Sequence, residues 1–522
     1  MAAQTWLSRN IAVYVDNPTA MRDFRAQLRG NKAIALWSLY LFVMMGFTLI
    51  NYYTISQSGS LSVTDIQFRL RSFYDNSMYM LAAAICLITP SLTAGSIVVE
   101  RQRKSLDLLF SAPVSLKGML VGKMIGAYRY TLMLLILSIP MTSVAVVMGG
   151  ATWSDVLQTY AILSFGGLVL TSIGLLISSL SETVGAAVIW TYLASGLYLY
   201  GILVVGSLAP PTGPSSSDMP FLLGMNPFFA VMTGPSHTLT AGHEIPNWIL
   251  IGLVSVLICR LSLLGAASHL SPFGSKETQS FRIQSALYLF AGLLLVGSNS
   301  RAFYDPKAVA DAVGVLCGIL IVFMPNILSY SVDGGKKFGY DGPPQVTGTF
   351  TGARSGSLAY LLLLWLAITL GVFIALLISV PNFAPDPGSQ LARETQLVNR
   401  LADYIPPFFY SAVWTFGFLF MFWGLARGIS ARAKTLKNSR SGLICAMVLF
   451  FGLPLPVLSM ITANDVYREN GLFSNHIWAV YLAYPFANHL ATAPIYAGLM
   501  VVIGFAGLAA ERERLKQPVI SG

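Results

Sequence analysis

The chain has 522 residues, of which 55% are hydrophobic and only 10% are charged. Soluble domains carry roughly 25% charged residues, so water is not the main solvent of this chain. The net charge of +10 does not indicate a nucleic acid partner, because Lys and Arg are scattered in short loops between apolar stretches. Composition therefore excludes an ordinary soluble domain and favours an integral membrane protein.

Apolar stretches that are long enough to cross a membrane recur along the whole sequence. Crossing the hydrocarbon core takes about 20 apolar residues in a helix. The sequence predicts an all-α polytopic membrane protein with about twelve transmembrane helices. The first six are expected near residues 33–55, 77–99, 119–148, 156–180, 184–207 and 248–268. The second six are expected near residues 283–300, 308–330, 357–380, 405–426, 442–462 and 488–510.

The distribution of basic residues predicts the orientation of these helices. With a cytoplasmic N-terminus, the large majority of the 32 Lys and Arg residues fall on the inner side. Because cytoplasmic loops of membrane proteins retain positive charge, both termini are expected in the cytoplasm. The helices fall into two sets, within residues 33–270 and 271–522. Ser38–Phe42 resembles Ala286–Phe290, so the second set is either a divergent repeat of the first or an appended domain.

A helix with two different faces is predicted before the first span, within residues 1–32. Asn17 and Pro18 suit its start, and Gly30 suits its end. Its apolar stripe consists of Met21, Phe24 and Leu28, and the adjoining cationic stripe consists of Arg22, Arg25 and Arg29. Such a helix can lie along an anionic cytoplasmic leaflet, so membrane lipids are an expected partner. A solvated linker helix is the alternative.

The segment Glu100–Pro113 follows the second predicted span on the cytoplasmic side. A charged run opens it, and Leu106, Leu109 and Phe110 then share one face of a short amphipathic turn that Pro113 stops. A short helix of this kind, projecting just beyond the membrane, suits a groove on a cytoplasmic partner. An ordinary positively charged loop fits the pattern equally well.

The same segment, taken with its flanks, carries a family resemblance. The sequence runs Glu100-Arg101-Gln102-Arg103, Leu106-Asp107-Leu108-Leu109, Ser111-Ala112-Pro113-Val114-Ser115 and Gly122-Lys123. It resembles the E-R-E…L-x-L-L…P-[LV]-S…G-K signature of ABC-2 type transporter permeases. The Asn17-Pro18 helix is similar to the amphipathic elbow of these permeases. The chain departs from the family pattern at Gln102, where a carboxylate is usual, and at Lys104-Ser105, where Gly-Thr is common.

The resemblance implies the permease subunit of an ABC exporter, with an elbow region at 1–32 and an ABC-2 type six-helix domain at 33–270. It implies that the segment between helices two and three contacts a separate ATP-binding subunit. The residues that this role falls on are Glu100, Arg101, Leu106, Asp107, Leu108, Leu109 and Pro113. ATP and Mg are then held by that partner, and no cofactor is expected in this chain.

The chain has one predicted coupling segment, whereas an ATPase dimer has two grooves. A second permease copy or a paralogue is therefore expected. The loop 331–356 stands where a repeat would place another such segment, but its glycines and prolines disfavour a helix. The expected location is the bacterial cytoplasmic (inner) membrane.

Two other classes of function are open at this level. An ion-coupled carrier with twelve helices would need ionisable groups within the spans, where the sequence places Arg129 and Arg260 but no evident carboxylate. A membrane-embedded lipid-modifying enzyme would need converging carboxylates or histidines, and the five histidines lie apart. Gly118–Lys123 is one residue short of a phosphate-loop spacing. We therefore predict neither a catalytic nor a metal-binding site.

Overall fold

The computed structural model describes a large part of the chain, which divides into two compact units. The described residues are 20–22, 24–25, 31–56, 63–104, 116–208, 226–233, 237–240, 243–270, 276–299, 356–382, 409, 412–413, 415–433, 438–439, 441–443, 445–446 and 493–516. Unit 1 comprises Met1–Leu203, Leu222–Leu239 and Glu244–Leu270. Unit 2 comprises Val204–Phe221, Thr240–His243 and Ser271–Gly522.

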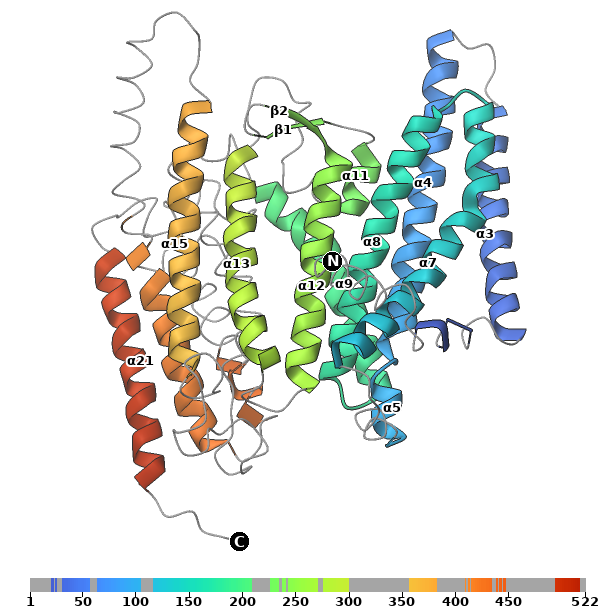
Figure 1. The fold of residues 1–522 in the computed structure, drawn as a ribbon. Coiled ribbons are helices and arrows are strands. Elements are labelled where there is room, and N and C mark those ends of the chain that lie inside the picture. The colour runs from blue at the N-terminus through green and yellow to red at the C-terminus, as the bar shows by residue number, and fades with distance from the viewer. Residues whose placement is uncertain are drawn as a thin grey trace, which may run out of the picture. The chain divides into compact units, whose positions relative to one another are not determined.

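Helices dominate the described residues (Figure 1). As far as Leu270 they are α3 (Asn31–Ser56), α4 (Val63–Ala94), α5 (Val98–Gln102), α7 (Leu116–Val147), α8 (Trp153–Leu180), α9 (Val184–Leu208), α11 (Pro227–Thr233) and α12 (Asn247–Leu270). Beyond it lie α13 (Lys276–Asn299), α15 (Gly356–Asn382) and α21 (Ala493–Lys516). The described residues also contain a two-stranded sheet, which the sequence did not predict. Its strands are β1 (His237–Thr240) and β2 (His243–Pro246).

Five stretches among the described residues are long and apolar enough to cross a membrane. They are Ile34–Thr54, Thr64–Gln102, Leu116–Val147, Trp153–Leu180 and Asn247–Leu270. The protein is therefore a helical integral membrane protein, as predicted. The total of twelve helices stays a prediction, because the stretch at 308–330 lies outside the described residues and those at 405–426 and 442–462 lie partly outside them.

Helix α4 begins well before its predicted start near residue 77. Its first turns contain charged residues, which a reading of hydropathy assigns to a loop. Arg71 pairs with Asp75 one turn later, at 3.4 Å, and with Asp155 of α8, at 3.1 Å. These ion pairs hold the polar turns in helical form and join the first part of α4 to the start of α8. Asp155 also forms a capping box with Thr152 at the start of α8.

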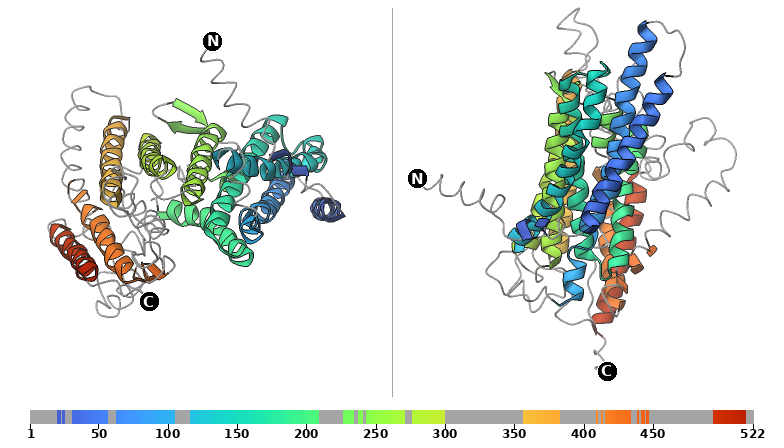
Figure 2. Two further views of the ribbon diagram at one scale, coloured as in Figure 1. Left: turned by 60° about the horizontal axis from the view of Figure 1, so that its bottom comes forward. Right: turned by 90° about the vertical axis from the view of Figure 1, so that its right-hand side faces the viewer.

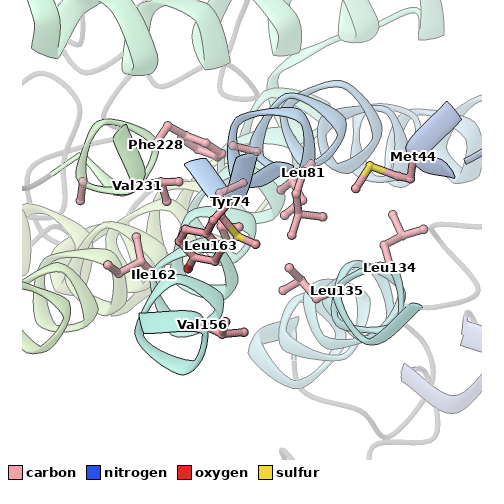
Figure 3. Close-up of a cluster of buried hydrophobic side chains, with 14 of the residues drawn as sticks. Met44, Tyr74, Leu81, Leu134, Leu135, Val156, Ile162, Leu163, Phe228 and Val231 are labelled. Carbon is pink, nitrogen blue, oxygen red and sulfur yellow. The ribbon is translucent and has the colours of Figure 1, made fainter. Parts of the chain in front are cut away.

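The core of unit 1 lies where α4, α7 and α8 pack together (Figure 3). Tyr74 and Leu81 of α4 meet Leu134 of α7 and Leu163 of α8 in one buried cluster. Small residues allow the helices to approach closely, as is common in membrane bundles. A Cβ atom built on Gly174 of α8 would overlap the side chain of Thr93 in α4. The two views in Figure 2 show the long helices of this unit running alongside each other.

Helix α11 and Asn226 before it lie between the fifth and sixth predicted spans. Asn226 is fully buried; its side-chain oxygen accepts the Phe228 N–H at 3.0 Å, and its amide donates to the Leu199 carbonyl at 3.2 Å. Phe228 packs beside Gly166, eleven residues and about 16 Å along α8 from Asp155. Helix α11 therefore lies well inside the helical bundle, with protein around its backbone.

Unit 2 contains two closely packed helix pairs among its described residues. Leu293 of α13 lies against Gly371 of α15. The described helix at 415–432 packs against α21 through facing glycines, since a Cβ built on Gly424 would overlap the backbone of Gly504. Along the same contact, Arg427 pairs with Glu511 at 3.2 Å.

A Gly174→Ala substitution tests the close packing of α4 and α8. The added methyl group overlaps a β-branched, fully packed side chain, so we expect a loss of about 1–3 kcal/mol in stability. Gly185→Ala is the matched control, because a Cβ there meets nothing within 4 Å. Thermal melting of the two variants in detergent makes the measurement. Equal melting temperatures would contradict the packing described here.

Candidate functional site

The candidate site lies where α4 ends and the predicted coupling segment begins. Helix α4 stops at Ala94, a turn follows at Gly95–Ile97, and the short helix α5 continues the chain beyond it (Figure 1). A break in a helix removes the acceptors of its next N–H groups. Here the Ser178 hydroxyl oxygen of α8 accepts the N–H of Ile97 at 3.0 Å and that of Val98 at 3.4 Å.

The Arg101 side chain is turned back toward the protein and lies over the C-terminal end of α8. Its guanidinium donates to the carbonyls of Ser181, at 2.7 Å, and Ser179, at 2.8 Å. The last carbonyls of a helix lack partners within that helix and carry its partial negative charge, so a guanidinium suits this place. Gln102 also donates to the Glu182 carbonyl, at 3.4 Å.

Glu100 joins the start of the predicted coupling segment to α7. Lys123, early in α7, donates to the Glu100 carboxylate at 2.7 Å and to the Ser96 carbonyl at 3.3 Å. The Lys123 side chain is only 4% exposed, and that of Glu100 is 17% exposed. A buried ammonium needs such partners, because its desolvation is costly. The ion pair thus holds together the residue that leads into the segment and the helix that follows it.

The amphipathic segment before α3 contributes a second cation to Glu100. Arg22 lies 3.4 Å from the same carboxylate oxygen as Lys123. Of the predicted interfacial residues, Met21 and Arg25 are exposed, whereas Phe24 is partly buried. Leu28 and Arg29 lie outside the described residues. The described part therefore shows an apolar and a basic side chain exposed together, next to an arginine that contacts the candidate site.

Lys104 stands where glycine is common in the family pattern, and its backbone has a glycine-like conformation. Its backbone has φ of +55°, a left-handed conformation that favours glycine. Its N–H donates to the Arg101 carbonyl at 3.1 Å, which closes the end of α5. Glycine is the usual residue at this position after a helix. The turn therefore has the geometry of a glycine turn although lysine occupies it.

The structure describes Glu100 and Arg101 among the predicted coupling residues. Leu106, Asp107, Leu108, Leu109 and Pro113 lie outside the described residues, so their role stays a prediction. Sequence reasoning missed Ser178, since one serine in an apolar helix carries no signal. It included Lys123 in the motif but did not predict its ion pair with Glu100.

The fold and this site define the class as a helical membrane protein with a structured, hydrogen-bonded connection after its second long helix. Residues 18–272 match the model of the ABC-2 family transporter proteins. The match covers a little under half of the chain, includes the candidate site, and supports the resemblance seen in the sequence. No curated protein matches the chain.

Replacing Lys123 tests the ion pair. In Lys123→Met the Glu100 carboxylate loses its nearest cation, and breaking a buried pair costs about 3–5 kcal/mol. We expect a clearly lower melting temperature in detergent, and recovery of much of the loss in the double variant Glu100→Gln/Lys123→Met. Lys117→Met, at an exposed position of the same helix, is the control. Additive losses in the double variant would refute a direct interaction.

Lys104→Gly should leave the protein as stable or more stable, because glycine adopts the observed φ without the cost of about 1–2 kcal/mol that other residues bear. Lys104→Val should destabilise it, since β-branched residues tolerate this conformation least. The melting temperatures of the two variants provide the comparison. A higher melting temperature for Lys104→Val than for Lys104→Gly would show that the turn has another geometry.

Proposed function

We propose that this chain is the transmembrane permease subunit of an ABC-2 type exporter. ATP hydrolysis takes place in a separate nucleotide-binding subunit, which holds ATP and Mg, and drives export of a substrate through this chain. One observation carries the proposal: within the ABC-2 domain, the buried Glu100–Lys123 ion pair joins the start of the segment at 100–113 to α7, the helix that follows the segment. A segment anchored in this way can pass a displacement of its tip into the membrane helices.

The segment at 100–113 contacts the nucleotide-binding subunit. The apolar side chains Leu106 and Leu109 enter a groove on that partner, while the base of the segment stays fixed by Glu100 and Arg101. An ATPase dimer has two equivalent grooves. The permease therefore works as a dimer, with a second copy of the chain or with a paralogue.

Both termini face the cytoplasm, and the protein lies in the bacterial cytoplasmic membrane. Two groups of charged residues, one near each end of α8, support this placement. Asp155 and Ser178 mark the two ends of α8, and 23 residues of helix between them span about 35 Å, close to the hydrocarbon thickness of about 30 Å. The group with Glu100 and Lys123 is cytoplasmic, and the group with Arg71 and Asp155 faces outward.

Anionic lipids of the cytoplasmic leaflet bind the amphipathic segment before α3. Arg25 and Met21 are exposed together there, and Met21 is 42% exposed. Arg22 of the same segment reaches Glu100, so lipid contact and the coupling segment are neighbours.

Charged substitutions on the predicted apolar face test the coupling role. Leu106→Asp and Leu109→Asp should abolish co-purification of the nucleotide-binding subunit, or lower permease-stimulated ATP hydrolysis at least about tenfold, because each puts a charge into an apolar groove. Leu109→Met conserves volume and apolar character, and it should retain most of the stimulation. Ser111→Asp adds the same charge on another face of the predicted turn and serves as the control.

The measurement uses membranes in which the chain is produced together with the nucleotide-binding subunit. Normal association and normal stimulation in both aspartate variants would remove the assigned role from this segment. Failure of any nucleotide-binding subunit to co-purify with the unaltered chain would overturn the proposed function itself.

A further inference from the structure

Helix α5 is attached to α8 by a set of directed hydrogen bonds. At its start, the N–H groups of Ile97 and Val98 donate to the Ser178 hydroxyl. Farther along, Arg101 donates to the carbonyls of Ser179 and Ser181, and Gln102 donates to the carbonyl of Glu182. These bonds follow α5 along its whole length, from the N–H of Ile97 to the side chain of Gln102.

The junction between α5 and α4 has a different character. The regular helical hydrogen bonds are interrupted at Gly95–Ile97, and the Ser96 N–H bonds to Thr93 with the shorter three-residue spacing, at 3.1 Å. A Cβ on Gly95 would make ordinary van der Waals contacts, 3.7 Å from Val99 and 3.8 Å from Val184, so the turn is packed without being overcrowded. A helix that is interrupted in this way bends more easily than a continuous one.

We propose that α5 moves with α8 rather than with α4, and that Ser178 is the positioning residue that holds the two together. The inference rests on the proposed function, since it says where a displacement of the segment at 100–113 goes. The turn at Gly95–Ile97 is the joint, and α8 receives the motion.

The far end of α8 determines the form of the motion. There Arg71 of α4 pairs with Asp155 at 3.1 Å, and the Tyr74 and Thr159 hydroxyls lie 3.0 Å apart. With α4 and α8 joined at this end, a displacement near Ser178 tilts α8 about the Arg71–Asp155 pair. The two helices separate or close at the cytoplasmic end.

Helix α9 follows α8 directly along the chain, and Gln102 donates to the carbonyl of Glu182 in the short connection between the two helices. Within α9, the Tyr192 hydroxyl donates to the Leu87 carbonyl of α4 at 2.6 Å, so α9 is held to α4 as well.

The first experiment removes the hydroxyl of Ser178 in the complete complex. In Ser178→Ala, two buried N–H groups lose their acceptor, and we expect permease-stimulated ATP hydrolysis to fall about tenfold while the nucleotide-binding subunit still co-purifies. Ser178→Thr keeps the hydroxyl and should retain stimulation. Ser172→Ala is the matched control: Ser172 is also fully buried in α8, but its hydroxyl donates to Val169 of its own helix at 2.8 Å.

The second experiment does not depend on a destabilising substitution. Cys86, Cys259, Cys317 and Cys445 are replaced by alanine, and Gln102→Cys/Glu182→Cys is introduced so that a short bifunctional thiol reagent can link α5 to the end of α8. If the two move as one body, the stimulated ATPase rate of this variant is the same before and after linking. Loss of the rate on linking would overturn the proposal.

A third measurement follows the motion itself. Spin labels are placed at Ser91, near the end of α4, and at Glu182, directly after α8, two exposed positions close to the end where the helices are expected to separate. Trapping nucleotide with vanadate should change their separation in the otherwise unaltered complex and in Ser172→Ala, but not in Ser178→Ala. The same change in Ser178→Ala would overturn the inference alone. No change in any complex, together with no stimulation of ATP hydrolysis, would overturn the proposed function as well.

Discussion

The N–H groups of Ile97 and Val98 have no acceptor within their own helix, because α4 ends at Ala94. At the edge of a membrane, such groups must be satisfied by protein, since the hydrocarbon offers no partner. The Ser178 hydroxyl accepts both. This one side chain therefore stabilises both the break after α4 and the start of α5, from which the chain continues into the segment at 100–113.

A second constraint is the burial of charge at the same end of the bundle. Lys123 is nearly inaccessible, and its ammonium is compensated by the Glu100 carboxylate and the Ser96 carbonyl. The pair joins the start of α7 to the residue after the helix break, and Arg22 approaches from the segment before α3. Three parts of the chain that lie far apart in sequence therefore meet at Glu100.

The two ends of α8 have complementary roles in this arrangement. Its beginning is tied to α4 by Arg71 and Asp155, whereas its end is tied to α5 by Ser178 and by the carbonyls that Arg101 contacts. Polar contacts therefore join α8 to its neighbours at both of its ends.

Composition and apolar periodicity determined the membrane class and the approximate places of most described helices, because about 20 apolar residues are required wherever a helix crosses the bilayer. The E-R…L-x-L-L…P signature indicated the family whose model matches residues 18–272, and it marked Glu100 and Arg101. Tertiary structure decided what these two residues contact, that α4 continues through Arg71, and that Asn226 begins a buried helix. The reason is physical: hydropathy records the cost of leaving water, whereas an ion pair or a shared hydroxyl exists only once distant segments are folded together.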